Sequence, residues 1–207
     1  MGSFGRIMCV NLKHNFGAPF VSAAVIVILT FLLFNVTGLK GNEAAKPIEL
    51  LLCWVGVMFL TPIFLPEQDR AIRDVICSKK TDYLKVCIIR VFYSVIATSG
   101  MIALFAGIMK ISESEMDMRY IFGGIATALF LGALGFAVSG LSGNTTAGYM
   151  AVTLYYLANY GLKEKLGRFY LFSMSAGSFM EKWWLLAGAA VLIAVTFAAM
   201  KVRQKFS

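Results

Sequence analysis

The chain has 207 residues, of which 59% are hydrophobic and 14% are charged, and its mean hydropathy is +0.76. Soluble domains carry about 25% charged residues, so this composition excludes a water-soluble globular fold and places most of the chain in lipid. The formal net charge of +8 does not indicate nucleic-acid binding, because no basic stripe with interleaved aromatic residues lies outside the apolar segments. We expect an all-α polytopic membrane protein that forms a single transmembrane domain over residues 1–207.

Six stretches approach the roughly 20 apolar residues that a helix needs to cross the hydrocarbon core. They comprise residues 18–36, 48–65, 86–109, 120–141, 145–162 and 183–200. The fifth is the most polar, because it contains Tyr155, Tyr156 and Asn159. Ionisable side chains (Glu49 and Arg90) lie only near the ends of these stretches, so we expect no charged group in mid-span. A proton relay or a carboxylate ion site is therefore not predicted.

Lys and Arg residues are divided unevenly between alternate loops. Eleven fall on the side of the N-terminal arm, the second loop and the C-terminal tail, and eight fall on the other side. Cytoplasmic loops of membrane proteins carry the excess of Lys and Arg. Both termini are therefore predicted to lie in the cytoplasm, although four cations after the fifth span reduce the difference in Lys and Arg count between the two sides.

The loop between the second and third spans carries the most informative pattern. Pro66 suits the first turn of a helix, and hydrophobic and charged residues then fall on opposite arcs, with oppositely charged pairs at i,i+4 spacing. Two interpretations remain open: a helix that lies on the lipid headgroups, or a helix that docks into a groove of a cytoplasmic partner. The residues concerned are Glu67, Asp69, Arg70, Ile72, Arg73, Asp74, Val75 and Ile76.

The N-terminal arm, residues 1–17, has a weaker amphipathic pattern. Its hydrophobic residues step by four and its cations share the opposite face, which predicts an interfacial helix before the first span. A disordered basic arm is the alternative. The residues concerned are Phe4, Arg6, Met8, Leu12, Lys13 and Phe16.

The segment before the sixth span is the third candidate. Residues 169–180 are largely apolar and too few to cross the membrane, but they can dip into the outer leaflet and return. A plain loop is the alternative.

Two ladders of small residues permit close helix packing, within the chain by default or with another subunit. They are Gly124, Ala128 and Gly132, and Ala190, Ala194 and Ala198.

Several chemical motifs are absent from the sequence. It has no P-loop pattern and no HExxH, its four cysteines show no paired spacing, and His14 is its only histidine. We therefore predict no nucleotide-binding, catalytic, cofactor or metal site in this chain, which we do not expect to be an enzyme. Energy for any transport must come from elsewhere, or the protein is passive.

Taken together, the layout resembles the permease subunits of type-2 ABC transporters, the bacterial exporters whose six-span permeases pair with separate ATPase chains. The features that carry the resemblance are the amphipathic arm, the charged stretch from Pro66 to Arg90, the short uncharged loop at 142–144 before the fifth span, and the apolar segment before the sixth.

The resemblance implies a coupling helix at Glu67–Cys77 seated on cytoplasmic P-loop ATPase subunits, which would bind ATP and Mg. It implies that the arm is a connecting helix and that spans one, two and five line a path between two permease copies, identical or homologous, in contact with membrane lipids. It also implies a multi-pass protein of a bacterial plasma membrane that exports a lipid, glycan, peptide or drug. The alternative is a non-transporting scaffold or immunity subunit that binds a partner complex.

Overall fold

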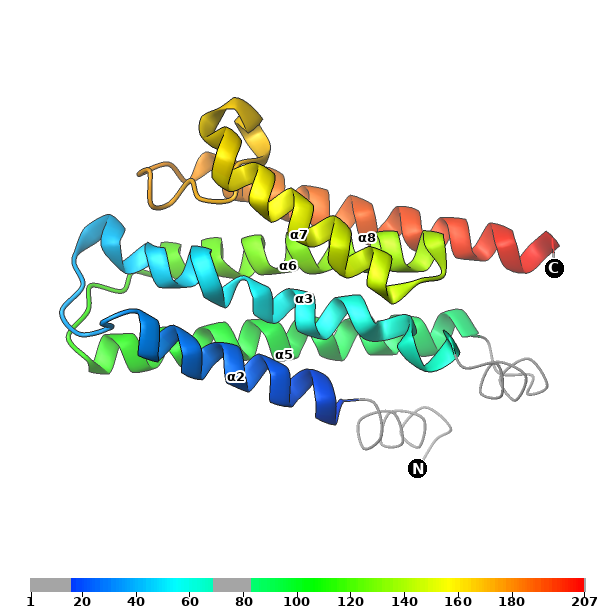
Figure 1. Ribbon diagram of the computed structural model, residues 1–207, viewed down its shortest axis with the longest axis horizontal. Helices are drawn as coiled ribbons and strands as arrows, with labels where there is room; N and C mark the ends of the chain where they lie inside the picture. Colours follow the sequence, from blue (N-terminus) through cyan, green and yellow to red (C-terminus); the bar gives the residue numbers. More distant parts are fainter. Residues whose placement is uncertain (1–15, 69–82, 207) are drawn as a thin grey trace.

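The structure, a computed structural model, describes residues 16–68 and 83–206, and every regular element in these ranges is helical (Figure 1). The all-α expectation is therefore confirmed for the described chain. The main elements are α2 (Gly17–Leu33), α3 (Trp54–Leu60), α5 (Tyr83–Ile111), α6 (Met118–Ser142), α7 (Thr145–Leu162) and α8 (Met180–Phe206).

The helices run back and forth along one long axis, so their ends gather at two places (Figure 1). One end, called here the terminal end, contains the start of α2, the end of the helical stretch before residue 69, the start of α5, the end of α8 and the α6–α7 turn. The opposite end, called the loop end, contains the connections at 34–40, 112–117 and 163–179. Backbone hydrogen bonds join the first two of these connections, from Gly38 N to Ser112 O and from Glu115 N to Leu39 O.

Within residues 16–68 and 83–206, four helical stretches are long and apolar enough to cross a membrane: Gly41–Pro66, Leu84–Ile111, Met118–Ser142 and Met180–Val202. This supports a multi-pass membrane protein. The other two expected spans are α2, an apolar helix of 17 residues, and α7, an 18-residue helix with a more polar sequence. A count of six crossings stays a prediction.

The second helical stretch is longer and less regular than the expected span at 48–65. It starts with a 3₁₀ turn, η1 (Gly41–Ala45), passes through a π-helical turn, η2 (Ile48–Leu52), and ends after α3 in a 3₁₀ segment, η3 (Thr61–Gln68). Pro66 lies inside η3. The expectation that Pro66 opens a new helix is wrong, because the 3₁₀ segment continues through it to Gln68.

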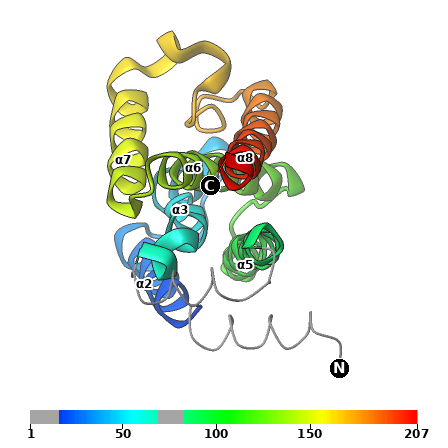
Figure 2. The ribbon, with the colours of Figure 1, turned by 90° about the vertical axis from the view of Figure 1, so that its right-hand side faces the viewer.

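Helix α6 lies at the centre of the bundle, between α7 and α8 and against α3 (Figure 2). Its approach to α3 is so close that backbones touch: a Cβ atom at Gly56 would overlap the carbonyl oxygen of Ala128, and one at Gly132 would overlap the carbonyl oxygen of Gly56. The first ladder of small residues therefore packs within the chain. Ala190, Ala194 and Ala198 of the second ladder are exposed on α8.

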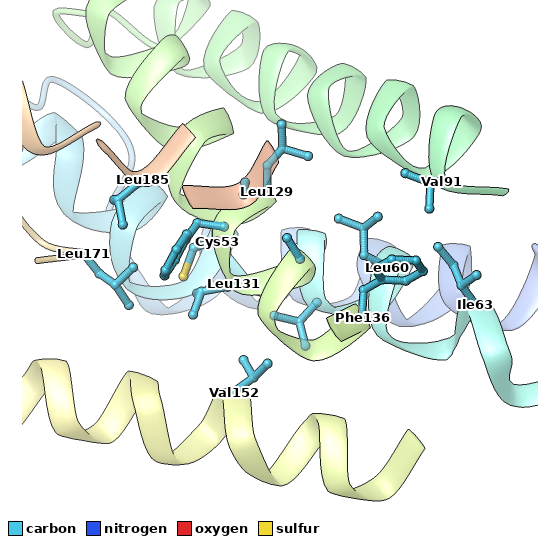
Figure 3. Close-up of a cluster of buried hydrophobic side chains, with 14 of the residues drawn as sticks. Cys53, Leu60, Ile63, Val91, Leu129, Leu131, Phe136, Val152, Leu171 and Leu185 are labelled. Atoms are coloured by element: carbon cyan, nitrogen blue, oxygen red, sulfur yellow. The ribbon is translucent and has the colours of Figure 1, made fainter. Parts of the chain in front are cut away.

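Two hydrophobic clusters fill the bundle. The larger draws on α3, α5, α6, α7 and α8, with Leu171 of the 163–179 connection beside Cys53 and Leu185 (Figure 3). The smaller joins α2 to α3 and α5 around Phe59 and Phe105. Burial of these side chains fixes the helix order that brings the polar groups of the interior together.

Gly56→Ala is expected to lower the free energy of unfolding by about 2 kcal/mol or more, because its Cβ would press on the α6 backbone rather than on a movable side chain. The matched control is Gly107→Ala, in an exposed part of α5 with nothing near the added Cβ. This control is expected to be neutral or slightly stabilising. Reversible unfolding in mixed micelles measures both, and equal effects would contradict the close α3–α6 crossing.

Candidate functional site

Most of the residues predicted for the coupling helix and for the interfacial arm lie outside the described ranges. For the coupling helix these are Asp69, Arg70, Ile72, Arg73, Asp74, Val75 and Ile76. For the arm they are Phe4, Arg6, Met8, Leu12 and Lys13. Glu67 belongs by its backbone to the end of η3. The coupling helix and the interfacial arm therefore stay predictions.

Phe16 is the described member of the arm, and it belongs to the bundle. Its ring stacks on Phe59 with centroids 5.1 Å apart, and it meets Tyr93 edge-on at 5.3 Å. Phe16 is also the residue immediately before α2. It therefore anchors the start of α2 to α3 and α5, a role that its helical spacing with Leu12 did not indicate.

The bundle contains a buried ion pair that the sequence analysis did not expect. Nζ of Lys182 lies 2.6 Å from Oε1 of Glu49, and both side chains are 1% exposed. The sequence analysis placed Glu49 near the end of a span and Lys182 outside the spans, and it foresaw neither their burial nor their pairing. Both helices extend beyond the apolar stretches at these residues.

Both charges have further hydrogen-bond partners. The Glu49 carboxylate accepts the backbone N–H groups of Met174 and Ser175, each at 2.9 Å. The Lys182 ammonium donates to Oγ1 of Thr127 at 2.8 Å and to the carbonyl oxygen of Leu171. The resulting polar cluster joins the second helical stretch, α6, α8 and the 163–179 connection. Such saturation is what allows an ion pair to persist away from water.

Local backbone structure positions the two charges. Glu49 lies in the π-helical turn η2, and such turns occur as local insertions at functional sites. Lys182 is in the first turn of α8. Thr127, which it contacts, is nine residues into α6, or about 14 Å along that helix. The charges therefore lie well inside the bundle rather than at its surface.

The connection at 163–179 is folded into the loop end rather than extended over it. It contains η4 (Lys163–Phe169) and then a series of turns, with Leu171 and Met174 fully buried. Asn159 of α7 accepts the backbone N–H of Leu171 at 3.0 Å. This burial favours the interpretation of an inward-dipping segment over that of a plain loop.

This cluster is better suited to holding structure than to catalysis or ion transfer. Within the described residues the buried charged side chains are Glu49, Arg90 and Lys182, and no group of three metal-ligating side chains occurs among them. Glu49 and Lys182 neutralise each other, and Arg90 of α5 donates to the carbonyl oxygen of Ile63 at 2.8 Å. The arrangement binds three helices and the inward-dipping segment together.

A second feature is a stripe of partly exposed residues on the second helical stretch. Leu50, Trp54, Met58 and Pro62 recur every four residues and are partly exposed. Trp54 and Leu50 contact Tyr156 of α7, and Met58 and Pro62 line a cavity with residues of α2. Figure 2 shows α3 between α2 and α7. At the terminal end this stripe borders a cavity of about 400 Å³. The cavity takes residues from α2, α3, η3, α5 and α7, and its lining includes Ser22, Met58, Pro62, Arg90, Tyr93 and Tyr149.

The terminal end of η3 is tied to its neighbours by side-chain bonds. Nε2 of Gln68 donates to Oγ1 of Thr145 at 2.8 Å, where α7 begins. Arg90 ties the same segment to α5 through Ile63. Movement of η3 would therefore be transmitted to both α5 and α7.

Comparisons of this chain with protein-family models, with curated proteins and with solved structures give no match.

Removing one charge of the pair should cost far more stability than removing both. Lys182→Met leaves the Glu49 carboxylate uncompensated and is expected to lower the free energy of unfolding by about 3–5 kcal/mol. Adding Glu49→Leu should recover part of this loss, giving a coupling energy of at least about 2 kcal/mol in a double-mutant cycle. Additive effects would show that the two charges do not interact.

Proposed function

We propose that the chain is the transmembrane permease subunit of an ATP-driven exporter, crossing the membrane six times with both termini in the cytoplasm. In this proposal a separate P-loop ATPase binds ATP and Mg and pushes on the segment after Gln68. The permease converts that push into opening of a path for a substrate, together with a second, identical or homologous, permease copy.

The observation that carries the proposal is the partly exposed stripe between α2 and α7. Helix α2, the second helical stretch, which contains the stripe, and helix α7 correspond to the first, second and fifth expected spans. The resemblance to type-2 ABC permeases assigns these spans to the path. The stripe is mostly apolar, with Trp54 packed against Tyr156 at 5.2 Å, and it ends at the cavity beside Arg90. A second copy of the chain facing this stripe would enclose a path with lipid-like walls.

The terminal end offers a mechanical route into this path. The end of η3 and the start of α5, which flank residues 69–82 in the chain, both lie there, together with the start of α2 and the end of α8 (Figure 1). A force on this segment would reach α7 through Gln68 and α5 through Arg90. Because α7 flanks the stripe, its displacement would change the width of the path.

The electrostatics of the interior support an external energy source. The buried carboxylate is neutralised by Lys182 and bonded to two backbone amides. A group used for ion coupling must gain and lose a proton or an ion, and the tight partners of Glu49 oppose this. Force from ATP hydrolysis in a partner then remains the suitable input.

Arg70→Glu/Arg73→Glu is expected to abolish export and co-purification with the ATPase while leaving membrane insertion unchanged, because charge reversal opposes docking of the segment on its partner. Lys201→Glu is the matched control. It reverses an exposed cation at the terminal end, on α8, and should leave export intact. Export assays in membrane vesicles and mass spectrometry of co-purified proteins measure both outcomes.

Unchanged export in the double variant would contradict coupling through this segment. Reporter tags that place residues 69–82 outside the cell would overturn the proposal itself. Co-purification with a partner that has no ATPase activity would instead favour the alternative of a non-transporting scaffold or immunity subunit.

A further inference from the structure

We infer that residues 168–176 form a lid at the loop end and that Glu49 holds this lid in place through hydrogen bonds that can be released. Lys182 balances the negative charge of Glu49 whether the lid is seated or released. The inference extends the proposed function, because a lid at the loop end would close the bundle on the side away from the ATPase. Its test requires neither an ATPase nor a transported substrate.

The lid is bounded on both sides by glycines in unusual backbone conformations. Gly167 has φ 57° and ψ −123°, and Gly177 has φ 86°. Side chains other than hydrogen are strained in these regions, whereas glycine enters and leaves them at low cost. The chain can therefore rotate at 167 and 177 while 168–176 keep their own turns, such as the bond from Gly177 N to Met174 O at 2.9 Å.

The polar contacts between the lid and the bundle come from few side chains. Glu49 accepts the N–H groups of Met174 and Ser175, and Asn159 accepts that of Leu171. Lys182 donates to the Leu171 carbonyl, and the Tyr155 hydroxyl donates to the Phe169 carbonyl. Among the described residues, no backbone–backbone hydrogen bond joins 168–176 to α2, α3, α5, α6, α7 or α8. Glu49 alone satisfies two adjacent amides, so it is the strongest of these attachments.

The apolar seat of the lid is shaped for a side chain that can withdraw. The sulfur of Met174 rests where Gly123 of α6 lacks a side chain, since a Cβ there would overlap it. Methionine is unbranched and flexible, so it can leave and re-enter such a notch. Nearby, Oγ of Ser173 is buried without a hydrogen-bond partner among the described residues. A hydroxyl left unsatisfied in the seated state would gain water on release.

Charge compensation makes the release reversible. A lone buried carboxylate that lost its amide donors would be left uncompensated, at a large cost in free energy. Here the ammonium of Lys182 stays 2.6 Å from Glu49 and retains Thr127 as a partner on α6. Because Lys182 and Thr127 lie outside 168–176, withdrawal of the lid breaks the amide bonds and leaves the ion pair in place.

The experiment measures how fast a thiol in the lid reacts with a membrane-impermeant maleimide. Ser173→Cys supplies the thiol at a buried position, and peptide-level mass spectrometry of the purified protein in nanodiscs distinguishes it from the native cysteines. Two variants are compared with this parent. Glu49→Asp keeps the charge but shortens the reach to the two amides, and Glu49→Leu/Lys182→Met removes both charges together so that neither is left uncompensated.

Both variants are expected to label residue 173 at least about tenfold faster than the parent, because local opening of the lid sets the rate. The native Cys87, fully buried near the start of α5 at the terminal end, should stay as slow as in the parent. Glu43→Gln is the matched control: it disrupts an exposed pair with Lys46 at the loop end and should change nothing.

Labelling of residue 173 at the parent rate in both variants would overturn the inference. Equal acceleration at Cys87 would also overturn it, because the pair would then hold the whole bundle rather than the lid. If the double variant does not accumulate, Glu49→Asp decides by the same criteria. These results are separate from the proposed function, since a chain that exports nothing would still show or lack the lid.

Discussion

The structure depends on balancing the negative charge of a buried carboxylate inside a lipid-facing bundle. Isolated buried charges are prohibitively costly, so Glu49 can occupy its position only with Lys182 against it and with the amides of Met174 and Ser175 on its free lone pairs. This requirement fixes the start of α8 against η2 and α6. It also draws the connection between α7 and α8 into the bundle, where an apolar loop would otherwise lie among the headgroups.

The pair can exist only because the helices around it pack closely. Backbone contact at Gly56 and Gly132 sets the crossing of α3 and α6. The packing of α6 against α8 brings Thr127 within reach of Lys182. The π-helical turn at 48–52 precedes α3 in the second helical stretch and contains Glu49. Small residues and one irregular turn thus prepare the position that the charges occupy.

Sequence patterns predicted the helices well where composition alone decides. The stretch at 145–162 coincides with α7, and the stretch at 120–141 lies within α6. The second span was placed too short, because the hydropathy of residues 41–47 did not reveal that they continue the helix as a 3₁₀ turn. Lys182 was assigned to a loop for the same reason: a cation beside Trp183 has the usual appearance of a membrane boundary.

The polar cluster was missed because its partners are far apart in the chain. Glu49 and Lys182 are separated by more than 130 residues, and no local periodicity links them. An acidic residue that begins a run of fully apolar residues, with a lone Lys before another such run, is the signal that could have suggested the pair. The backbone amides of Met174 and Ser175 leave no trace in the sequence, so the inward fold of 168–176 could be foreseen only as one of two alternatives.

The two ends of the bundle have different designs, which suits a protein that receives force at one end and closes the other. At the terminal end, Gln68 and Arg90 link η3 to α7 and α5. At the loop end, a short segment between two glycines is held by side chains from three helices. In the proposed exporter, the first end transmits movement and the second limits when the path is open.

The central claim is that the amides of residues 174 and 175 are bonded inside the bundle. Hydrogen–deuterium exchange of the unmodified chain in nanodiscs tests it most directly. We expect peptides that cover 171–176 to exchange slowly, far more slowly than the exposed part of η4 at 165–168. Exchange of 171–176 as fast as that of 165–168 would show that Glu49 does not hold this segment.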